Sequence, residues 1–167
     1  MFRGKDDQKT FPTKGNKTNA LLELVYTDVC GPINIRATGG YEYFITFIDV
    51  HSRYGYVYIM QHKSEAFEKF KEFRAKVKKQ LDTHIKVVRS DQCGEYLSNE
   101  FIDHLVQNRI LSQLTAPGTP QQNGVAKRKN QNLLDMTRSM MSYSDLSLFL
   151  WGYAMEITMY ILMCVDQ

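Results

Sequence analysis

Apolar residues recur along the chain with two different periods, which predict strands in its first third and mainly helices later. Three β-rich runs come first, at 21–28, 41–50 and 54–60. Only the short polar link 51–53 separates the second run from the third, and such a link predicts an antiparallel hairpin. The first run ends at Asp28, so we expect this acid at the end of a strand.

Helical spacing begins at Ser64, which we expect to cap an amphipathic helix that runs to about Gln80. Its apolar positions are Phe67, Phe70, Val77 and Leu81. A fourth strand, 85–89, precedes Asp91, and Ser98 is expected to cap a second helix. The buried stripe of that helix would be Phe101, Ile102, Leu105 and Val106. We expect the charged residues of the first helix to form a solvated outer face.

The last third of the chain is expected to hold one short strand and two helices. The strand is 110–114, and the loop 115–124 follows it because that stretch contains two prolines and two glycines. A long helix would start near Gly124 or Val125. Its inward positions would be Leu133, Leu134, Met136, Thr137, Met140 and Met141. A final helix is predicted at about 146–164.

This order of elements predicts an α/β fold. Three strands that run antiparallel, followed by alternating helices and strands, describe a five-stranded mixed sheet flanked by helices. The first and fourth strands can lie side by side at the centre of such a sheet. Their C-terminal ends would then bring Asp28 and Asp91 together.

The composition adds bounds on the class of protein. A chain of 167 residues that is 43% hydrophobic can form one ordinary domain. We expect a flexible lead-in at 1–20, the domain at 21–165 and a truncated tail at 166–167. The longest apolar stretch, 146–165, is interrupted by Glu156, so we expect a core helix and no membrane span. Three widely spaced cysteines indicate neither a disulfide framework nor a zinc site, which favours an intracellular protein.

Seven stretches of the sequence carry a pattern shared by one family, and they are 27–32, 43–49, 52–54, 89–91, 94–96, 117–125 and 151–154. Together they resemble the integrase core of copia-type LTR retrotransposons, a part of the Pol polyprotein. The resemblance implies an RNase H-like fold and DNA integration by metal-dependent polynucleotidyl transfer. Gln92 and Cys93 stand where the family usually has an Arg-Gly pair, and Val50 and His51 also depart from its pattern. We therefore expect a degenerate fragment of such an element.

The resemblance also implies a catalytic triad of two aspartates and a glutamate that holds Mg²⁺ or Mn²⁺. Asp28 and Asp91 match the two aspartates. The glutamate follows the second aspartate after 35 residues, and that position is Lys127. An ammonium group has no lone pair for a metal and repels cations, so we expect activity to be absent or strongly impaired. Glu95 belongs to the shared family pattern and is not expected to replace the missing ligand.

Polar and basic residues early in the long helix are expected to contact DNA, because in the family this helix faces the ends of the element. The expected contacts are Asn123, Lys127, Arg128, Lys129, Asn130, Gln131 and Arg138. Such contacts to phosphates need no metal and weaken with salt. We also expect a homodimer or higher oligomer formed through the core domain, and a nuclear location if the protein functions.

Two other functions remain open at this point. One is a non-enzymatic DNA-binding or dimerisation module adopted by the host, with the last helix as its interface. The other is an RNase H-like nuclease that uses one metal with Asp28 and Asp91. Two further residues are expected to be structural, Asp49 in a polar role and Trp151 in the core.

Overall fold

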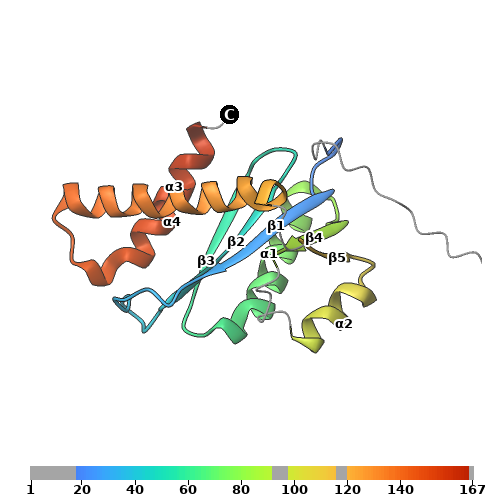
Figure 1. The fold of residues 1–167 in the computed structure, drawn as a ribbon, viewed down its shortest axis with the longest axis horizontal. Coiled ribbons are helices and arrows are strands. Elements are labelled where there is room, and N and C mark those ends of the chain that lie inside the picture. The colour runs from blue at the N-terminus through green and yellow to red at the C-terminus, as the bar shows by residue number, and fades with distance from the viewer. Residues whose placement is uncertain (1–17, 92–97, 116–119, 166–167) are drawn as a thin grey trace, which may run out of the picture.

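A computed structural model describes residues 18–91, 98–115 and 120–165, with only the backbone described at 120–123 and 125. Its five strands form one sheet with helices on both sides (Figure 1). The strands are β1 (Leu24–Cys30), β2 (Tyr43–Asp49), β3 (Gly55–Met60), β4 (Val87–Ser90) and β5 (Leu111–Leu114). The helices are η1 (Lys63–Glu65), α1 (Ala66–Leu81), α2 (Asn99–Gln107), α3 (Pro120–Ser144), η2 (Leu148–Leu150) and α4 (Trp151–Val165).

The strands lie in the order β3-β2-β1-β4-β5. β1, β2 and β3 pair antiparallel, which confirms the predicted hairpin, and β4 and β5 are added in parallel. β1 and β4 are neighbours, as predicted, with Leu24 opposite Val87 and Tyr26 opposite Arg89. The mixed sheet is therefore built around the two strands that carry the candidate acids.

One face of the sheet packs against α1 and α2 through an aromatic core. Phe47 of β2 stacks on Phe73 of α1 with ring centroids 4.5 Å apart. Phe70 contacts Phe47 and also Phe101 of α2. All four of these phenylalanines are fully buried. This layer makes the sheet a rigid platform for the residues on its other face.

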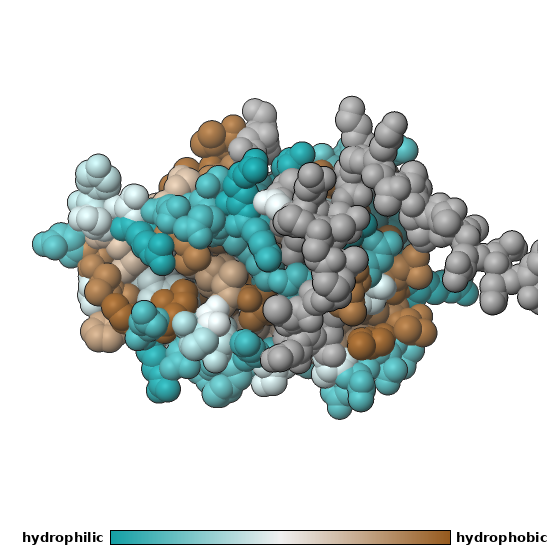
Figure 2. All heavy atoms as spheres, viewed as in Figure 1, coloured by the Kyte–Doolittle hydropathy of each residue, from teal (hydrophilic) through white to brown (hydrophobic). Residues whose placement is uncertain are grey.

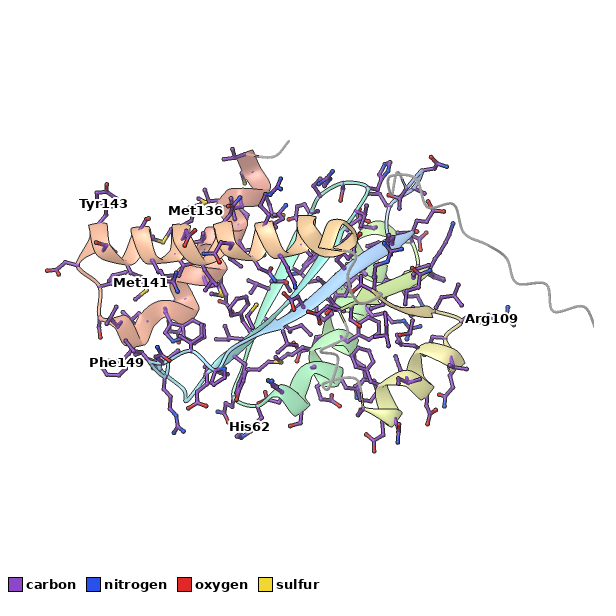
Figure 3. All side chains as sticks on the ribbon, in the orientation of Figure 1. His62, Arg109, Met136, Met141, Tyr143 and Phe149 are labelled. Carbon is purple, nitrogen blue, oxygen red and sulfur yellow. The ribbon has the colours of Figure 1, made fainter. Side chains whose placement is uncertain are left out.

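The other face is covered by α3 and α4, which pack against each other (Figure 1). The buried positions of α3 recur at helical spacing: Ala126, Asn130, Leu133, Thr137 and Met141. Figure 3 shows Met141 pointing from α3 toward α4, while Tyr143 projects away from the body. Trp151 is buried at the start of α4, and its Nε1 donates to the Ile35 carbonyl at 2.6 Å, so the expected core position of Trp151 is confirmed.

Two predicted helix starts are wrong. α3 begins at Pro120, four residues before the predicted start at Gly124, because proline has no N–H to leave unpaired and its fixed φ suits the first helical turn. Ser64 is not a cap but lies inside η1. The Glu65 carboxylate accepts hydrogen bonds from the N–H groups of Gln61 and His62 instead, at 2.9 and 2.8 Å.

Several residues expected in buried stripes are exposed. In α2, Phe101 and Leu105 are buried as predicted, whereas Ile102 is 40% exposed and Val106 is 70% exposed. A residue next to a buried one on a helix points about 100° away from it, so a helix that packs on one side buries only one of the two. Met136, next to buried Thr137, is exposed for the same reason, whereas Leu81 is exposed as the last residue of α1.

The C-terminal part of the molecule is unusually apolar at its surface. Figure 2 shows apolar side chains around the turn between α3 and α4, whereas polar residues line the outer face of α3. The stretch Leu148–Val165 is long and apolar enough to cross a membrane, and 39% of it is buried. Core helices of soluble proteins pass the same test, so this single candidate is weak evidence against the expected absence of a span.

Candidate active site

The sheet places Asp28 and Asp91 at the same level on adjacent strands. Each paired residue of β4 is numbered 63 above its partner in β1, and the last such pair is Tyr26 and Arg89. Two positions further along the same register, Asp28 lies opposite Asp91. Register partners in a sheet point to the same face, here the face under α3. Asp91 directly follows β4, as expected. Asp28 is not at a strand end as predicted, because β1 continues to Cys30 through its pairing with β2.

Asp28 is half-buried and is held by neighbours on one side. Its Oδ2 accepts a hydrogen bond from Asn130 Nδ2 at 2.9 Å and contacts Cys30 Sγ at 3.8 Å. Burial raises the pKa of the Asp28 carboxyl, and the negative charge of Asp91 raises it further. The Asn130 hydrogen bond and the charge of Lys127 act in the opposite direction.

Asn130 of α3 links β1 and β2 through hydrogen bonds of its side chain. Its exposed fraction is 4%, and its Oδ1 accepts a hydrogen bond from Thr46 Oγ1 at 2.8 Å. Thr46 is the partner of Asp28 in the β1–β2 register. The side chain of Asn130 is thus turned into the protein, which is at odds with the DNA contact expected of it. Asn130 follows Ala126 by four residues and precedes Leu133 by three, which is the spacing of one helix face. The sequence alone could therefore have placed Asn130 on the buried face of α3.

Lys127 lies one turn before Asn130 and reaches Asp91. Its Nζ is 4.0 Å from Asp91 Oδ2. The Lys127 side chain is 63% exposed and that of Asp91 is 20% exposed. The three positions expected to be catalytic therefore meet in space, with an ammonium group where the sequence resemblance implies a third carboxylate.

Comparison with known proteins identifies the family of this site. Residues 19–120 match the integrase core domain, which is more than half of the chain. The chain belongs to the integrase core domain family.

Relatives of this integrase core are retrotransposon polyproteins. It is 40% identical over 159 residues to the retrovirus-related Pol polyprotein from transposon TNT 1-94 of Nicotiana tabacum, covering 95% of this chain and 12% of the polyprotein. It is 27% identical over 161 residues to the Pol polyprotein from transposon RE2 of Arabidopsis thaliana, covering 96% and 11%. The chain thus spans about a tenth of the length of these relatives.

Solved structures confirm the RNase H-like fold of this integrase core. The HTLV-2 integrase catalytic core domain in complex with magnesium has a TM-score of 0.61 at 15% identity, covering 84% of each chain. A chain of the simian T-cell lymphotropic virus intasome, in complex with a regulatory subunit of PP2A, has a TM-score of 0.68 at 16% identity. That match covers 86% of this chain and 49% of the other.

The residues expected to contact DNA lie on different sides of α3. Arg128 is exposed, while Lys129 Nζ donates to the Arg53 carbonyl in the turn between β2 and β3. Asn123 lies in the first turns of α3, but its side chain is outside the described part of the structure.

Two further expected contacts, Gln131 and Arg138, share one acidic neighbour. Gln131 Nε2 donates to Asp135 Oδ1 at 3.0 Å, and Arg138 Nη1 pairs with the same oxygen at 3.4 Å. All three residues are exposed. In the first half of α3, the side chains of Lys127 and Arg128 are exposed and place positive charge at the surface.

Two described residues of the site carry carboxylates that could hold a cation. Asp28 and Asp91 supply two carboxylates on one face, and cations such as Mg²⁺ prefer oxygen ligands. Among the described residues, no group of three acids, histidines or cysteines could hold a metal ion. Lys127 cannot supply the third ligand. Glu95 lies outside the described residues.

Two other side chains of β1 and β2 carry groups that could take part in chemistry, Cys30 and Asp49. Asp49 is buried, and its carboxylate accepts hydrogen bonds from the N–H groups of Leu22 and Ser52 at 3.0 and 2.9 Å, which confirms the structural role expected of it. Cys30 is not suited to be a nucleophile, because burial raises its thiol pKa to about 12.

Proposed function

We propose that this chain is the integrase core of a copia-type Pol polyprotein that binds DNA and acts in the nucleus, and that its strand-transfer activity is strongly impaired. The observation that carries the proposal is the Lys127 ammonium 4.0 Å from Asp91 Oδ2. The position is the one that the family resemblance gives to the third acid.

The chemistry of the family explains why this exchange matters. Divalent cations held by Asp28, Asp91 and a third acid would supply activation of the attacking oxygen and stabilisation of the leaving oxygen in a phosphoryl displacement. Asp28 and Asp91 remain as ligands for Mg²⁺ or Mn²⁺, but the charge at position 127 is reversed. One positive charge at this distance from Asp91 competes with a cation for that carboxylate. We infer weakened cation binding at one position and loss of the second.

DNA binding does not depend on the missing acid. Arg128 and Lys129 lie in the same turn of α3 as Lys127, and contacts from such residues to phosphates need no metal. Lys127 adds a positive charge to this surface. We therefore propose that affinity for DNA persists without divalent cations and falls steeply with salt.

A strand-transfer assay with an oligonucleotide substrate and Mn²⁺ tests the proposal. The unaltered chain should form no detectable strand-transfer product, and Lys127→Glu should restore metal-dependent formation of that product. Arg128→Glu is the matched control, because it makes the same change of charge on an adjacent exposed residue of α3. Robust joining by the unaltered chain, or equal gains in both variants, would refute the proposal.

A second function is favoured by the exposed apolar side of α4. This side and the preceding η2 expose Leu148, Phe149, Tyr153, Ile157, Tyr160 and Val165. An apolar patch of this kind is typical of a protein interface. We propose a core-mediated homodimer, with or without catalysis.

Light scattering coupled to gel filtration tests the dimer. Ile157→Glu should convert a dimer to a monomer, while Glu156→Gln, on an adjacent exposed residue, should not. A monomeric unaltered chain at tens of micromolar would exclude this interface.

A further inference from the structure

Asp28 is connected to β2 by a continuous chain of side-chain hydrogen bonds that passes through α3. Thr46 Oγ1 donates to Asn130 Oδ1 at 2.8 Å, and Asn130 Nδ2 donates to Asp28 Oδ2 at 2.9 Å. Thr46 has an exposed fraction of 0% and Asn130 of 4%. These hydrogen bonds therefore lie inside the protein, between the sheet and α3.

The direction of these hydrogen bonds is set by chemistry. An ionised carboxylate can only accept, so the NH₂ group of Asn130 must face Asp28. The amide oxygen then faces β2, where the hydroxyl of Thr46 can donate to it. Each group has a partner of the correct kind, and a flipped amide would place two acceptors against each other at Asp28.

The same contacts divide the two oxygens of Asp28 between different tasks. Asn130 and Cys30 both approach Oδ2. Within the described part of the chain these contacts leave Oδ1 for a cation on the face shared with Asp91. A carboxylate that is fixed through one oxygen presents the other in a constant direction, and such orientation by surrounding groups is typical of metal sites.

We infer that Asn130, oriented by Thr46, is a positioning residue that holds Asp28 in the rotamer required for a metal ligand. This role replaces the DNA contact expected of Asn130 from the sequence. It rests on the proposed function of Asp28, but the orientation itself exists without a metal.

The test uses substitutions at Thr46, which contacts Asn130. Thr46→Val removes the hydroxyl at nearly constant shape, and Thr46→Ser keeps it. Asn130→Leu removes the central amide. Thr137→Val is the matched control, because Thr137 is also buried and its hydroxyl donates to the Leu133 carbonyl within α3.

The first measurement is the χ1 angle of Asp28 in the metal-free protein, from NMR couplings between the backbone and the side-chain carboxyl carbon. We expect one rotamer in the unaltered chain, Thr46→Ser and Thr137→Val, and averaged rotamers in Thr46→Val and Asn130→Leu. A fixed χ1 in a folded Thr46→Val protein would overturn the inference. Should Asn130→Leu not fold, the three threonine variants still decide the question.

The second measurement is Mn²⁺ affinity by calorimetry in a Lys127→Glu background. Adding Thr46→Val should weaken binding about tenfold, at the lower end of what such supporting residues contribute, whereas adding Thr46→Ser should not. Absence of Mn²⁺ binding in the Lys127→Glu protein would count against the proposed function alone, because the χ1 result stands without metal. Averaged χ1 with unchanged Mn²⁺ affinity would overturn the positioning role.

Discussion

Reversing the charge of residue 127 should couple the stability of the fold to divalent cations. Lys127 Nζ and Asp91 Oδ2 are 4.0 Å apart, which corresponds to a Coulomb energy of about 4 kcal/mol at an effective dielectric constant of roughly 20. Because the lysine side chain is 63% exposed, the measurable attraction is closer to the ~0.2–1 kcal/mol of surface pairs. Lys127→Glu removes this attraction and adds a repulsion of similar size. We expect a cost of about 0.4–2 kcal/mol in metal-free buffer.

Divalent cations should reverse that cost. A ligand whose free concentration is 100 times its dissociation constant stabilises a fold by about 2.7 kcal/mol. Thermal unfolding in EDTA should thus place Lys127→Glu roughly 1–8 °C below the unaltered chain, since 1 kcal/mol shifts the Tm of a domain of this size by about 2–4 °C. Saturating Mg²⁺ or Mn²⁺ should raise the variant by at least as much, and the unaltered chain by less.

Arg128→Glu supplies the comparison, because an exposed position away from the acids should change stability by at most about 0.5 kcal/mol. Its unfolding should respond to cations as the unaltered chain does. The reasoning is refuted if Lys127→Glu and Arg128→Glu show the same dependence of Tm on Mg²⁺.

Three other outcomes follow from the structure. The pKa of Asp28 is raised in the folded state, so the stability of the fold falls as the pH rises from the pKa of the unfolded chain toward that of the folded chain. In urea titrations, Asp28→Asn should therefore be more stable than the unaltered chain at pH 7 and lose that advantage near pH 3. Phe70→Ala should cost about 3–5 kcal/mol by denaturant unfolding, and Val106→Ala less than about 1 kcal/mol. Iodoacetamide at pH 8 should alkylate exposed Cys164 well before Cys30, whose pKa is raised to about 12, as mass spectrometry can measure.

Much of the fold follows from local patterns in the sequence. The alternation in 41–50 and 54–60 and the short link between them indicate the hairpin, because side-chain period and turn length are local properties. The adjacency of β1 and β4 follows from the order of elements. The start of α3 does not, since Pro120 after a loop rich in proline is compatible with either more loop or a first helical turn.

The candidate site was predictable only in part, because some of its contacts join residues that are far apart in the sequence. Asp28 and Asp91 come at or near the ends of apolar runs, so their meeting follows from the sheet. The role of Asn130 depends on Thr46, which is 84 positions away, and no local pattern links the two residues. The place of Lys127 came from family spacing, because a lysine on a helix is by itself typical of a solvated face.

The exposure of Lys127 has a genetic consequence. The Lys127 side chain is 63% exposed, so a glutamate in its place should lower the free energy of unfolding by no more than about 2 kcal/mol without a cation, and both chains should fold. The codons for these two amino acids differ at a single base. Under the proposed function, two copies of this core that differ only there should both give folded protein, and one point mutation would separate an inactive core from an active one.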